Sequence, residues 1–255
     1  MMTKKDCIRN LIRWQKKAKD RKEDGVFVTE GERAYAEIPA DRIIFSAVSE
    51  SYSRTHDIPE GAVILTDSEF SRVSDTKTPQ GILAAVRMKL FTEEEVLKDP
   101  EGMYILLETI QDPGNLGTIL RAAEAAGVSG ILMNRETVDP YSPKVIRSTM
   151  GALHRVPFAV SEDLSAAVRR IRELGGSVFA ADLRGAVPYD AQDYTKMTAF
   201  LIGNEGNGLS EALSLSADRR IIIPMKGKTE SLNAAMAAAI LMFEGARQRR
   251  NAGKD

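Results

Sequence analysis

The strongest restriction on the fold of this chain is a regular alternation of strand-like and helix-like patterns over residues 103–250. Short runs rich in β-branched and other apolar residues alternate with stretches whose apolar positions repeat at helical spacing. The strand-like runs are 103–110, 130–133, 177–183, 198–203 and 219–225, and the helix-like stretches are 115–127, 142–151, 163–174, 210–216 and 232–250. Strands that are joined through helices pair in parallel, and the helices then cover both faces of the sheet. The sequence therefore predicts an α/β domain built on a parallel sheet.

The first part of the chain has a different pattern. Residues 1–88 mix helical stretches with short strands such as 42–45 and 62–65, and the run from 89 to 100, KLFTEEEVLKDP, is highly charged. A charged stretch that separates two differently patterned blocks indicates a boundary between domains. The predicted organisation is a smaller α/β domain over 1–90, a linker over 91–100 and the parallel-sheet domain over 101–255.

Composition places the chain among soluble proteins of a reducing compartment. Its 255 residues are 43% hydrophobic and 28% charged, which suits a chain with a large buried core. Cys7 is the one cysteine, so an internal disulfide is excluded. No apolar run is long enough to span a bilayer, and the N-terminus lacks the apolar core of a signal peptide. We therefore expect a cytoplasmic protein without a membrane anchor.

The N-terminal segment carries a local excess of positive charge. Residues 1–22 hold nine Lys or Arg against two Asp, although the net charge of the whole chain is −1. Four of these cations recur at helical spacing and share one face: Arg9, Arg13, Lys16 and Lys17. Two interpretations are open. The segment is either a solvated amphipathic helix or a surface that contacts phosphates, with Trp14 available for packing or stacking.

Three polar, glycine-containing loops follow predicted strands of the second block. They are QDPGN at 111–115, GNEGNG at 203–208 and MKGKTESLN at 225–233. Any one of them could be an ordinary turn. On parallel α/β sheets, however, ligands bind beyond the carboxyl ends of the strands, and all three loops are predicted at that edge. The sequence therefore predicts a ligand site built from these loops.

Several ligand chemistries fit the sequence poorly. Gly227-Lys228-Thr229 ends like a nucleotide-binding phosphate loop, but that loop needs a glycine where Ile222 stands, inside a strand. Two histidines and one cysteine without clustered spacing argue against a metal centre. We interpret His154 as a packed or hydrogen-bonded residue rather than a general base. The glycines of 203–208 lack the spacing of a dinucleotide fingerprint, which disfavours hydride transfer.

Three ordered motifs resemble those of the SpoU (TrmH-like) branch of the SPOUT RNA methyltransferases. NLGTILRAAEAAG is similar to the first motif, Asn-x-Gly-x-x-x-Arg, through Asn115 and Arg121. LIGNEGNGLS is similar to the second, which centres on Glu205, and IPMKGKTESLNAAMAAAILMFE resembles the third through Ser231-Leu232-Asn233. Residues 1–88, with FVTEGER and TPQG, also resemble the ribosomal-protein-like RNA-binding domain of several members.

The resemblance implies a fold, an assembly and a reaction. The C-terminal domain is expected to contain a deep trefoil knot, and the protein to be a homodimer in which the arginine of the first motif works near the partner's cofactor. S-adenosylmethionine would be held by backbone groups near Leu183, Gly203, Ile223 and Leu232, where glycine leaves space for a cofactor lying against the chain. The implied reaction is methylation of a ribose 2′-hydroxyl of RNA, and the separate N-terminal domain favours ribosomal RNA.

The resemblance also implies a set of catalytic residues: Arg121, Asn115, Glu205, Ser231 and Asn233. The family's arginine is proposed as the base, yet a guanidinium keeps its proton far above neutral pH. A phosphate clamp, or a stabiliser of the forming alkoxide, is therefore an equally open role. Local explanations are open too: Asn115 and Ser231 as helix caps, and Arg121 paired with Glu124. A tRNA substrate, and an RNA-binding protein without turnover, remain the alternative functions.

Overall fold

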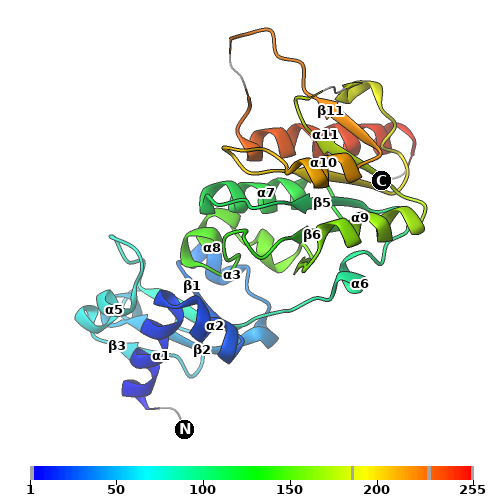
Figure 1. Cartoon of the computed structure of the whole chain (residues 1–255). Coiled ribbons are helices and arrows are strands. Elements are labelled where there is room, and N and C mark those ends of the chain that lie inside the picture. Colours follow the sequence, from blue (N-terminus) through cyan, green and yellow to red (C-terminus); the bar gives the residue numbers. More distant parts are fainter. Residues whose placement is uncertain (1–2, 185–186, 229–230, 254–255) are drawn as a thin grey trace. The chain divides into compact units, whose positions relative to one another are not determined.

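The computed structural model describes residues 3–184, 187–228 and 231–253, and the chain forms two compact units (Figure 1). Unit 1 consists of Met1–Lys89 and Asp139–His154, and unit 2 consists of Leu90–Val138 and Arg155–Asp255. Each unit has its own sheet and its own apolar core. The chain therefore passes from one unit to the other three times along its length.

Unit 1 is built on a four-stranded sheet with the strand order β1-β4-β2-β3. β1 (Val26–Glu30) and β2 (Ile43–Ser49) pair antiparallel with β4 (Ile82–Arg87), and β3 (Val63–Leu65) pairs parallel with β2. Its α-helices are α1 (Lys4–Lys16), α2 (Ala18–Asp24), α3 (Glu32–Ala36), α4 (Glu50–Ser53), α5 (Asp67–Val73) and α8 (Pro143–Thr149). The apolar face of α1 contributes Cys7, Leu11 and Trp14 to the core. The smaller α/β fold predicted for the N-terminal part is confirmed.

The segment 139–154 lies in the middle of the sequence predicted as the second domain, yet its contacts are with unit 1. Asp139 accepts hydrogen bonds from the buried Arg21, with 2.5 Å between Nη2 and Oδ2. The ring centroids of Tyr141 and Phe27 are 4.9 Å apart. Removal of the carboxylate would leave the charge of a buried arginine without a partner and would strongly destabilise the folded unit. The segment is thus an integral part of the core of unit 1.

Unit 2 contains a seven-stranded sheet with the order β7-β6-β5-β10-β8-β11-β9, in which every pair of neighbours is parallel. The strands are β5 (Met103–Leu107), β6 (Gly130–Met133), β7 (Phe158–Val160), β8 (Ser177–Ala181), β9 (Val187–Pro188), β10 (Thr198–Ile202) and β11 (Arg219–Ile222). Every residue of the central strands β5 and β10 is buried. The short outer strands β7 and β9 are additional to the prediction.

Helices cover both faces of this sheet, as predicted from the sequence. They are α6 (Glu93–Val96), α7 (Pro113–Ala125), α9 (Leu164–Glu173), α10 (Glu211–Ser216) and α11 (Ala234–Asn251). α9 and α10 pack on the face that presents Leu106 and Leu201. α11 packs against α7 and lies on the face that presents Met103. Its close approach needs Gly245, because a Cβ there would lie 2.6 Å from the sulfur of Met103.

The first turn of α7 differs from the prediction in a way that matters for the site. We predicted Asn115 as the N-cap, but the cap is Asp112, whose Oδ1 accepts the backbone N–H of Asn115 at 2.9 Å. Pro113 at the first helical position suits this start, because its missing N–H needs no partner there. The helix ends at Ala125, with Gly127 at φ +71° just beyond it. The side chain of Asn115 is therefore available for other contacts.

Candidate functional site

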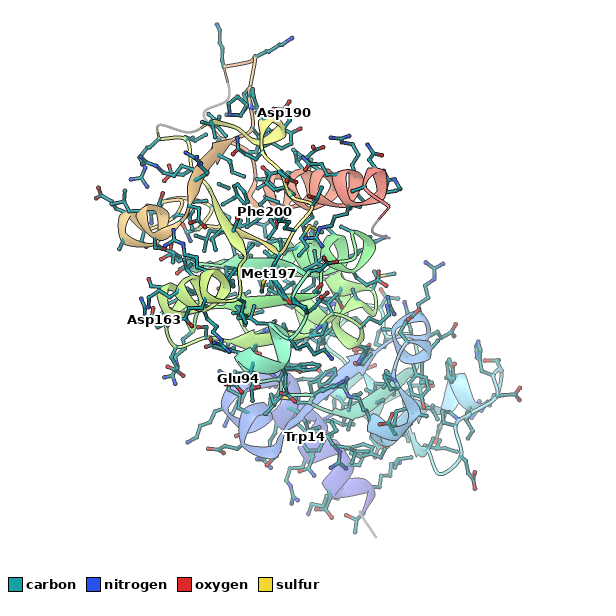
Figure 2. The ribbon with its side chains drawn as sticks, turned by 90° about the vertical axis from the view of Figure 1, so that its right-hand side faces the viewer. Trp14, Glu94, Asp163, Asp190, Met197 and Phe200 are labelled. Atoms are coloured by element: carbon teal, nitrogen blue, oxygen red, sulfur yellow. The ribbon has the colours of Figure 1, made fainter. Side chains whose placement is uncertain are left out.

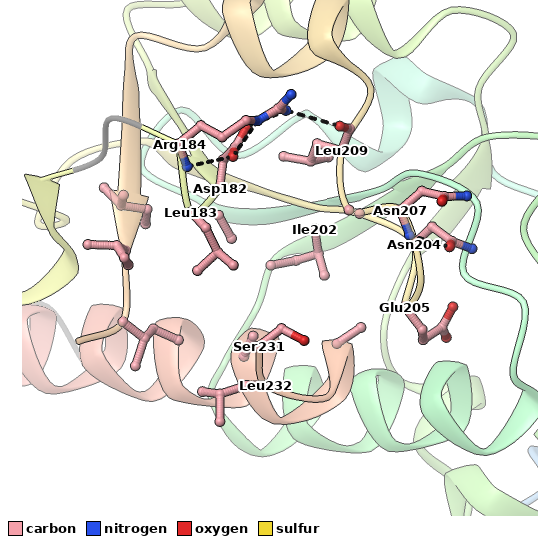
Figure 3. Close-up of a pocket in the computed structure, with 18 of the residues that line it drawn as sticks. Asp182, Leu183, Arg184, Ile202, Asn204, Glu205, Asn207, Leu209, Ser231 and Leu232 are labelled. Atoms are coloured by element: carbon pink, nitrogen blue, oxygen red, sulfur yellow. Dashed lines mark hydrogen bonds and ion pairs between the residues drawn. The ribbon is translucent and has the colours of Figure 1, made fainter. Parts of the chain in front are cut away.

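A cavity of about 460 Å³ lies at the carboxyl ends of three neighbouring strands, β10, β8 and β11 (Figure 3). Its wall consists of residues 181–184 at the end of β8, 202–209 at the end of β10 and 221–223 at the end of β11. Met225, Ser231 and Leu232 from the loop that follows β11 complete the wall, and the start of α11 closes it. This edge is where parallel α/β sheets bind ligands. The volume falls within the range of small-molecule sites. Of the three loops predicted to form a ligand site, those at 203–208 and 225–233 contribute to the cavity wall, and the loop at 111–115 adjoins the cavity.

The four residues predicted to hold a cofactor all line the cavity: Leu183, Gly203, Ile223 and Leu232. They come from three different loops, so only the folded chain brings them together. Leu183 and Leu232 leave 52% and 37% of their surface exposed. When a ligand covers apolar side chains that are exposed inside a cavity, the complex is stabilised by about 25 cal/mol for each Å² of apolar surface removed from water. The cavity is therefore suited to a ligand with apolar surface.

Gly203 is the point of closest approach between backbone segments in this wall. A Cβ built there would overlap the backbone of Gly208 and Leu209. The loop closes on itself through two hydrogen bonds, from the N–H of Asn204 to the oxygen of Gly208 at 3.0 Å and back at 2.9 Å. Any side chain at position 203 would force this loop apart. Glycine is required here by space rather than by its φ angle.

A chain of hydrogen-bonded side chains adjoins the cavity. Asn115 Nδ2 donates to Glu205 Oε1 at 2.8 Å, and Asn233 Nδ2 donates to Asn115 Oδ1 at 2.9 Å. Asn233 is fixed in turn, because its Oδ1 caps α11 by accepting the N–H groups of Ala235 and Met236. Each amide therefore has one orientation that satisfies its partners. Three residues from three loops are held in one arrangement.

The carboxylate of Glu205 is kept ionised by these contacts. Burial opposes the charge, but hydrogen bonds from Asn115 and from the backbone N–H groups of Gln111 and Asp112 hold the pKa of Glu205 below its ordinary value. The backbone contacts are long, at 3.4 Å and 3.5 Å. At neutral pH Glu205 is thus an acceptor of hydrogen bonds and not a donor.

An ion pair in the cavity wall was not predicted from the sequence. Asp182 accepts hydrogen bonds from Arg184 Nε at 3.0 Å and Nη2 at 2.8 Å (Figure 3). Ser214 Oγ also donates to Asp182 Oδ2, at 2.5 Å. Burial opposes ionisation, but these bonds lower the pKa of Asp182 to about 2. The available signal was its place directly after the buried β8, at the ligand-binding edge. The pair shapes the wall beside Leu183.

The structure decides between several local explanations of the motif residues. Asn233, and not Ser231, is the N-cap of α11, and Ser231 lines the cavity instead. Glu124 does not pair with Arg121, because its Oε1 accepts Arg155 Nε at 2.8 Å. Arg121 is exposed on α7 and has no hydrogen bond or ion pair with any residue that the structure describes. Of the five predicted catalytic residues, Glu205 and Ser231 line the cavity, and Asn115 and Asn233 are joined to it through Glu205. Arg121 neither lines the cavity nor bonds to a residue that does.

Two of the four predicted RNA-contacting cations, which lie on α1 and at its C-cap Lys17, form ion pairs with acidic neighbours. Arg9 pairs with Asp6 at 2.8 Å, and Arg13 pairs with Asp20 at 3.3 Å. Lys16 and Lys17 are exposed and have no ion pair within the described ranges. Trp14, which is labelled in Figure 2, is buried. Its Nε1 donates to Asp24 at 2.7 Å, so it packs and is not available to stack on a base.

Other features singled out in the sequence do not form sites of their own. Thr229 of the Gly-Lys-Thr tripeptide lies outside the described residues, and a Cβ at Gly227 would meet no atom within 4 Å. The ring of His154 lies 6.0 Å from that of Phe27, which agrees with a packed role. Across the described parts of the chain, no cluster of His, Cys, Asp and Glu could hold a metal ion. Nor does any helix there combine the length and apolar character that crossing a membrane requires.

Two family descriptions match this chain in consecutive segments. The description of the SpoU rRNA methylase family matches residues 102–243, which include the cavity. That of the MRM3-like substrate-binding domain matches residues 5–84, within unit 1. Together the two matches account for most of the chain.

Three relatives illustrate the similarity. The 23S rRNA (guanosine(2553)-2′-O)-methyltransferase RlmP of Bacillus subtilis is 33% identical over 88% of this chain and 90% of its own length. The crystal structure of an rRNA methyltransferase from Sinorhizobium meliloti with bound AdoMet has a TM-score of 0.82 and 29% identity, covering 97% of both chains. The SpoU methyltransferase AviRb of Streptomyces viridochromogenes, in complex with the cofactor AdoMet, has a TM-score of 0.83 and 25% identity, covering 96% of this chain and 98% of that one.

Proposed function

The chain belongs to the SpoU rRNA methylase family, and from this premise we propose that it methylates a ribose 2′-hydroxyl of ribosomal RNA with S-adenosylmethionine as the methyl donor. The observation that carries the proposal is the cavity at the ends of β8, β10 and β11, where the second and third motif loops meet and the first adjoins through Asn115. The Bacillus subtilis relative, named for a 2′-O-methylation of 23S rRNA, supports ribosomal RNA as the substrate.

The residues of the cavity fit S-adenosylmethionine. Leu183 and Leu232 offer apolar surface for an adenosine moiety, and the bare backbone at Gly203 lets it lie against the chain. The ionised Glu205 at the cavity is an acceptor that suits a ligand carrying ammonium and sulfonium charges. When bound, the donor supplies a methyl group attached to a positively charged sulfur, a good leaving group. Ile223 adds further apolar surface to the wall.

We assign orientation of the ribose to the chain of amides, and charge stabilisation to Arg121. A ribose hydroxyl is a weak nucleophile, so its proton must leave as the oxygen attacks. Asn115 is held between Glu205 and Asn233, and groups fixed in advance align a substrate without reorganising. The guanidinium N–H donors of Arg121 have no partner among the described residues. Its planar fork suits an RNA phosphate beside the reacting ribose and the forming alkoxide.

The place of Arg121 supports a homodimer in which the partner subunit supplies this arginine to the cavity. α7 packs against α11, and α11 exposes 57% of Met236 and 51% of Phe243, with the half-buried Ile240 between them at helical spacing. An exposed apolar stripe of this kind is typical of an interface. Changing Met236 and Phe243 to Asp should convert a dimer to a monomer in light scattering. Leu215→Asp, on the exposed side of α10, is the matched control, and a monomeric wild type at micromolar concentration would contradict the proposal.

Family membership also leads us to propose a trefoil knot in unit 2 and a cytoplasmic location. The strand order supports the knot, since β10 lies between β5 and β8 although it follows both in sequence. Such threading is a rare exception to the rule that chains are not knotted.

The experiment that tests the function compares RNA from cells with and without the gene. All 2′-O-methylated nucleotides of ribosomal and transfer RNA are mapped in both strains. We expect one ribosomal 2′-O-methyl group to disappear, and the guanosine equivalent to the one named for the Bacillus subtilis relative is the first position to inspect. If a 2′-O-methyl group were lost only from tRNA, the substrate would be tRNA and not ribosomal RNA. Identical maps in the two strains would reject the proposed reaction.

A further inference from the structure

One residue at the edge of the site has an unfavourable backbone conformation. Thr109 follows β5 and has φ +59°. Left-handed backbone is uncommon for any residue with a Cβ and is a true outlier for a β-branched one. Only one other non-glycine residue of the described chain has positive φ, namely Met150 in unit 1. Strain of this kind persists only where the surroundings hold it in place.

Every polar group of Thr109 is bound. Its N–H donates to Asn134 Oδ1 at 2.8 Å, and its Oγ1 accepts Asn134 Nδ2 at 2.8 Å. Its carbonyl oxygen accepts Asn204 Nδ2 at 2.9 Å. Asn134 is fixed from behind, because Thr137 Oγ1 donates to its Oδ1 at 2.9 Å. Two asparagine side chains from different loops therefore hold this conformation.

These bonds join the two loops that carry Asn115 and Glu205. Asn204 is the residue before Glu205, and its Oδ1 also accepts the N–H groups of Gly206 and Asn207 at 2.8 Å and 3.1 Å. On the other side, the left-handed turn at Thr109 sets the direction of the chain that leads to Asn115. If Thr109 relaxed to negative φ, that chain would be turned away from the loop of Glu205.

We propose that Thr109 is a positioning residue, whose left-handed backbone, held by Asn134 and Asn204, sets the contact between Asn115 and Glu205. The inference rests on the proposed function, because that contact is assigned to alignment of the ribose. Neither Thr109 nor Asn134 lines the cavity, so both act through other residues. Binding of S-adenosylmethionine should depend little on them, and the rate of methyl transfer should depend on them strongly.

The test compares Thr109→Val with Thr109→Gly. Valine keeps the shape and the strain of threonine but removes the hydroxyl that Asn134 holds, whereas glycine adopts positive φ without strain. If Thr109 has a positioning role, Thr109→Val should lower kcat by about tenfold. Without the hydroxyl bond to Asn134, the backbone of residue 109 would leave the left-handed conformation, which is disfavoured for a residue with a Cβ by about that factor. Thr109→Gly should lower kcat less, by about threefold, and the KM for S-adenosylmethionine should stay within about twofold in both.

A role in ordinary packing predicts the reverse order, with valine harmless and glycine destabilising, and that order would overturn the inference. Met150→Gly is the matched control, since it changes a left-handed residue of unit 1 and should leave kcat unchanged. Crystal structures of the two variants give a readout that does not need activity. The bond between Asn115 and Glu205 should persist in Thr109→Gly and be broken in Thr109→Val. If the bond persists in both variants, Thr109 does not position the site. This readout does not depend on activity, so it tests the inference whether or not the protein proves to be a methyltransferase.

Discussion

The polar groups at the cavity of unit 2 and the cations of the first helices of unit 1 find their partners in different ways. At the cavity, Asn115 bonds to Glu205 and Asn233, which lie 90 and 118 residues away in the sequence. In unit 1, Arg13 bonds to Asp20, only 7 residues away and on the next helix. The first set of contacts exists only once the whole of unit 2 has folded.

This difference separates a site from a surface. Bonds between distant loops fix those loops relative to one another, so a change in one partner disturbs the others. Exposed local ion pairs contribute only about 0.2–1 kcal/mol each and leave their charges accessible. Substitutions at the cavity should therefore act on catalysis or cofactor binding with large effects. Substitutions on α1 should act on RNA affinity with small ones.

The largest effect is expected at Arg121. Arg121→Ala should lower kcat by about 100-fold or more, the loss typical of a removed electrostatic stabiliser. The affinity for S-adenosylmethionine, measured by calorimetry, should stay near that of the wild type, because the role assigned to Arg121 is toward the RNA phosphate and the forming alkoxide and not toward the methyl donor. Arg121→Lys should fail as well, since an ammonium cannot replace a planar fork.

Arg135→Ala is the matched control for Arg121, because Arg135 is an exposed arginine of unit 2 that pairs with Glu162. It should leave kcat unchanged. If Arg121→Ala lost affinity for S-adenosylmethionine by the same factor as it lost kcat, Arg121 would be a structural residue. That result would contradict its assignment to the catalytic site.

The next effect concerns the tight loop after β10. Gly203→Ala places a Cβ against the backbone of Gly208 and Leu209, and overpacking of this kind costs about 1–3 kcal/mol. We expect the Kd for S-adenosylmethionine to rise by about tenfold or more, with circular dichroism and cooperative unfolding retained. Gly206→Ala is a graded comparison in the same loop, because its Cβ would lie 3.4 Å from Asn204 Oδ1 and needs little adjustment. Equal losses in the two variants would contradict the role given to Gly203.

A third prediction concerns stability and pH. The pKa of Asp182 is lowered from 3.8 to about 2, so its ionised form stabilises the folded state fully above pH 3.8, and this stabilisation is lost as the pH falls through about 2. Asp182→Asn should lower the free energy of unfolding at pH 7 by about 1 kcal/mol, less than the full pKa shift would give, because the Arg184 side chain is 56% exposed and solvent screens the pair. The gap to the wild type should narrow below pH 4 in urea titrations. Asp20→Asn, which removes a partner of Arg13 in unit 1, should lower the free energy of unfolding by less than about 1 kcal/mol. Equal losses of stability in Asp182→Asn and Asp20→Asn would contradict the difference drawn between the cavity and the α1 surface.

The smallest effect is expected on α1. Replacing Arg9, Arg13, Lys16 and Lys17 with Gln should weaken RNA binding and flatten its salt dependence, with S-adenosylmethionine affinity unchanged. Because Lys16 and Lys17 have no ion pair among the described residues, Lys16→Gln and Lys17→Gln together should account for most of the change. Each phosphate that the protein no longer neutralises reduces the slope of log K against log salt by about 0.7–0.9. An unchanged slope in the fourfold variant would leave α1 a solvated face.

Much of the fold follows from patterns that a sequence displays directly. β5 and β10 are buried along their whole length, so they stand out in the sequence as continuous apolar runs, and their alternation with helices predicts the parallel sheet. The segment 139–154 could not be assigned to unit 1 in this way. Its place depends on Asp139 meeting Arg21, and a pair 118 residues apart leaves no local signal.

The site could be predicted as far as its motif residues, but not in its detailed contacts. Asp112, Asn115, Ser231 and Asn233 can all cap a helix, and which of them does so depends on backbone geometry that composition does not reveal. The positive φ of Thr109 is equally hidden, since threonine normally avoids it. Cancellation of Arg9 by Asp6 could have been seen from their spacing of three residues on one helix.

The measurement that tests the central claim most directly is methyl transfer by the purified protein. Ribosomal RNA is incubated with S-adenosylmethionine that carries an isotopically labelled methyl group, digested to nucleosides and analysed by mass spectrometry. Our account predicts label on a ribose 2′-oxygen with the wild type, and almost none with Arg121→Ala although that variant still binds the donor. Label on a base, or no label on any RNA from a protein that binds the donor, would contradict it.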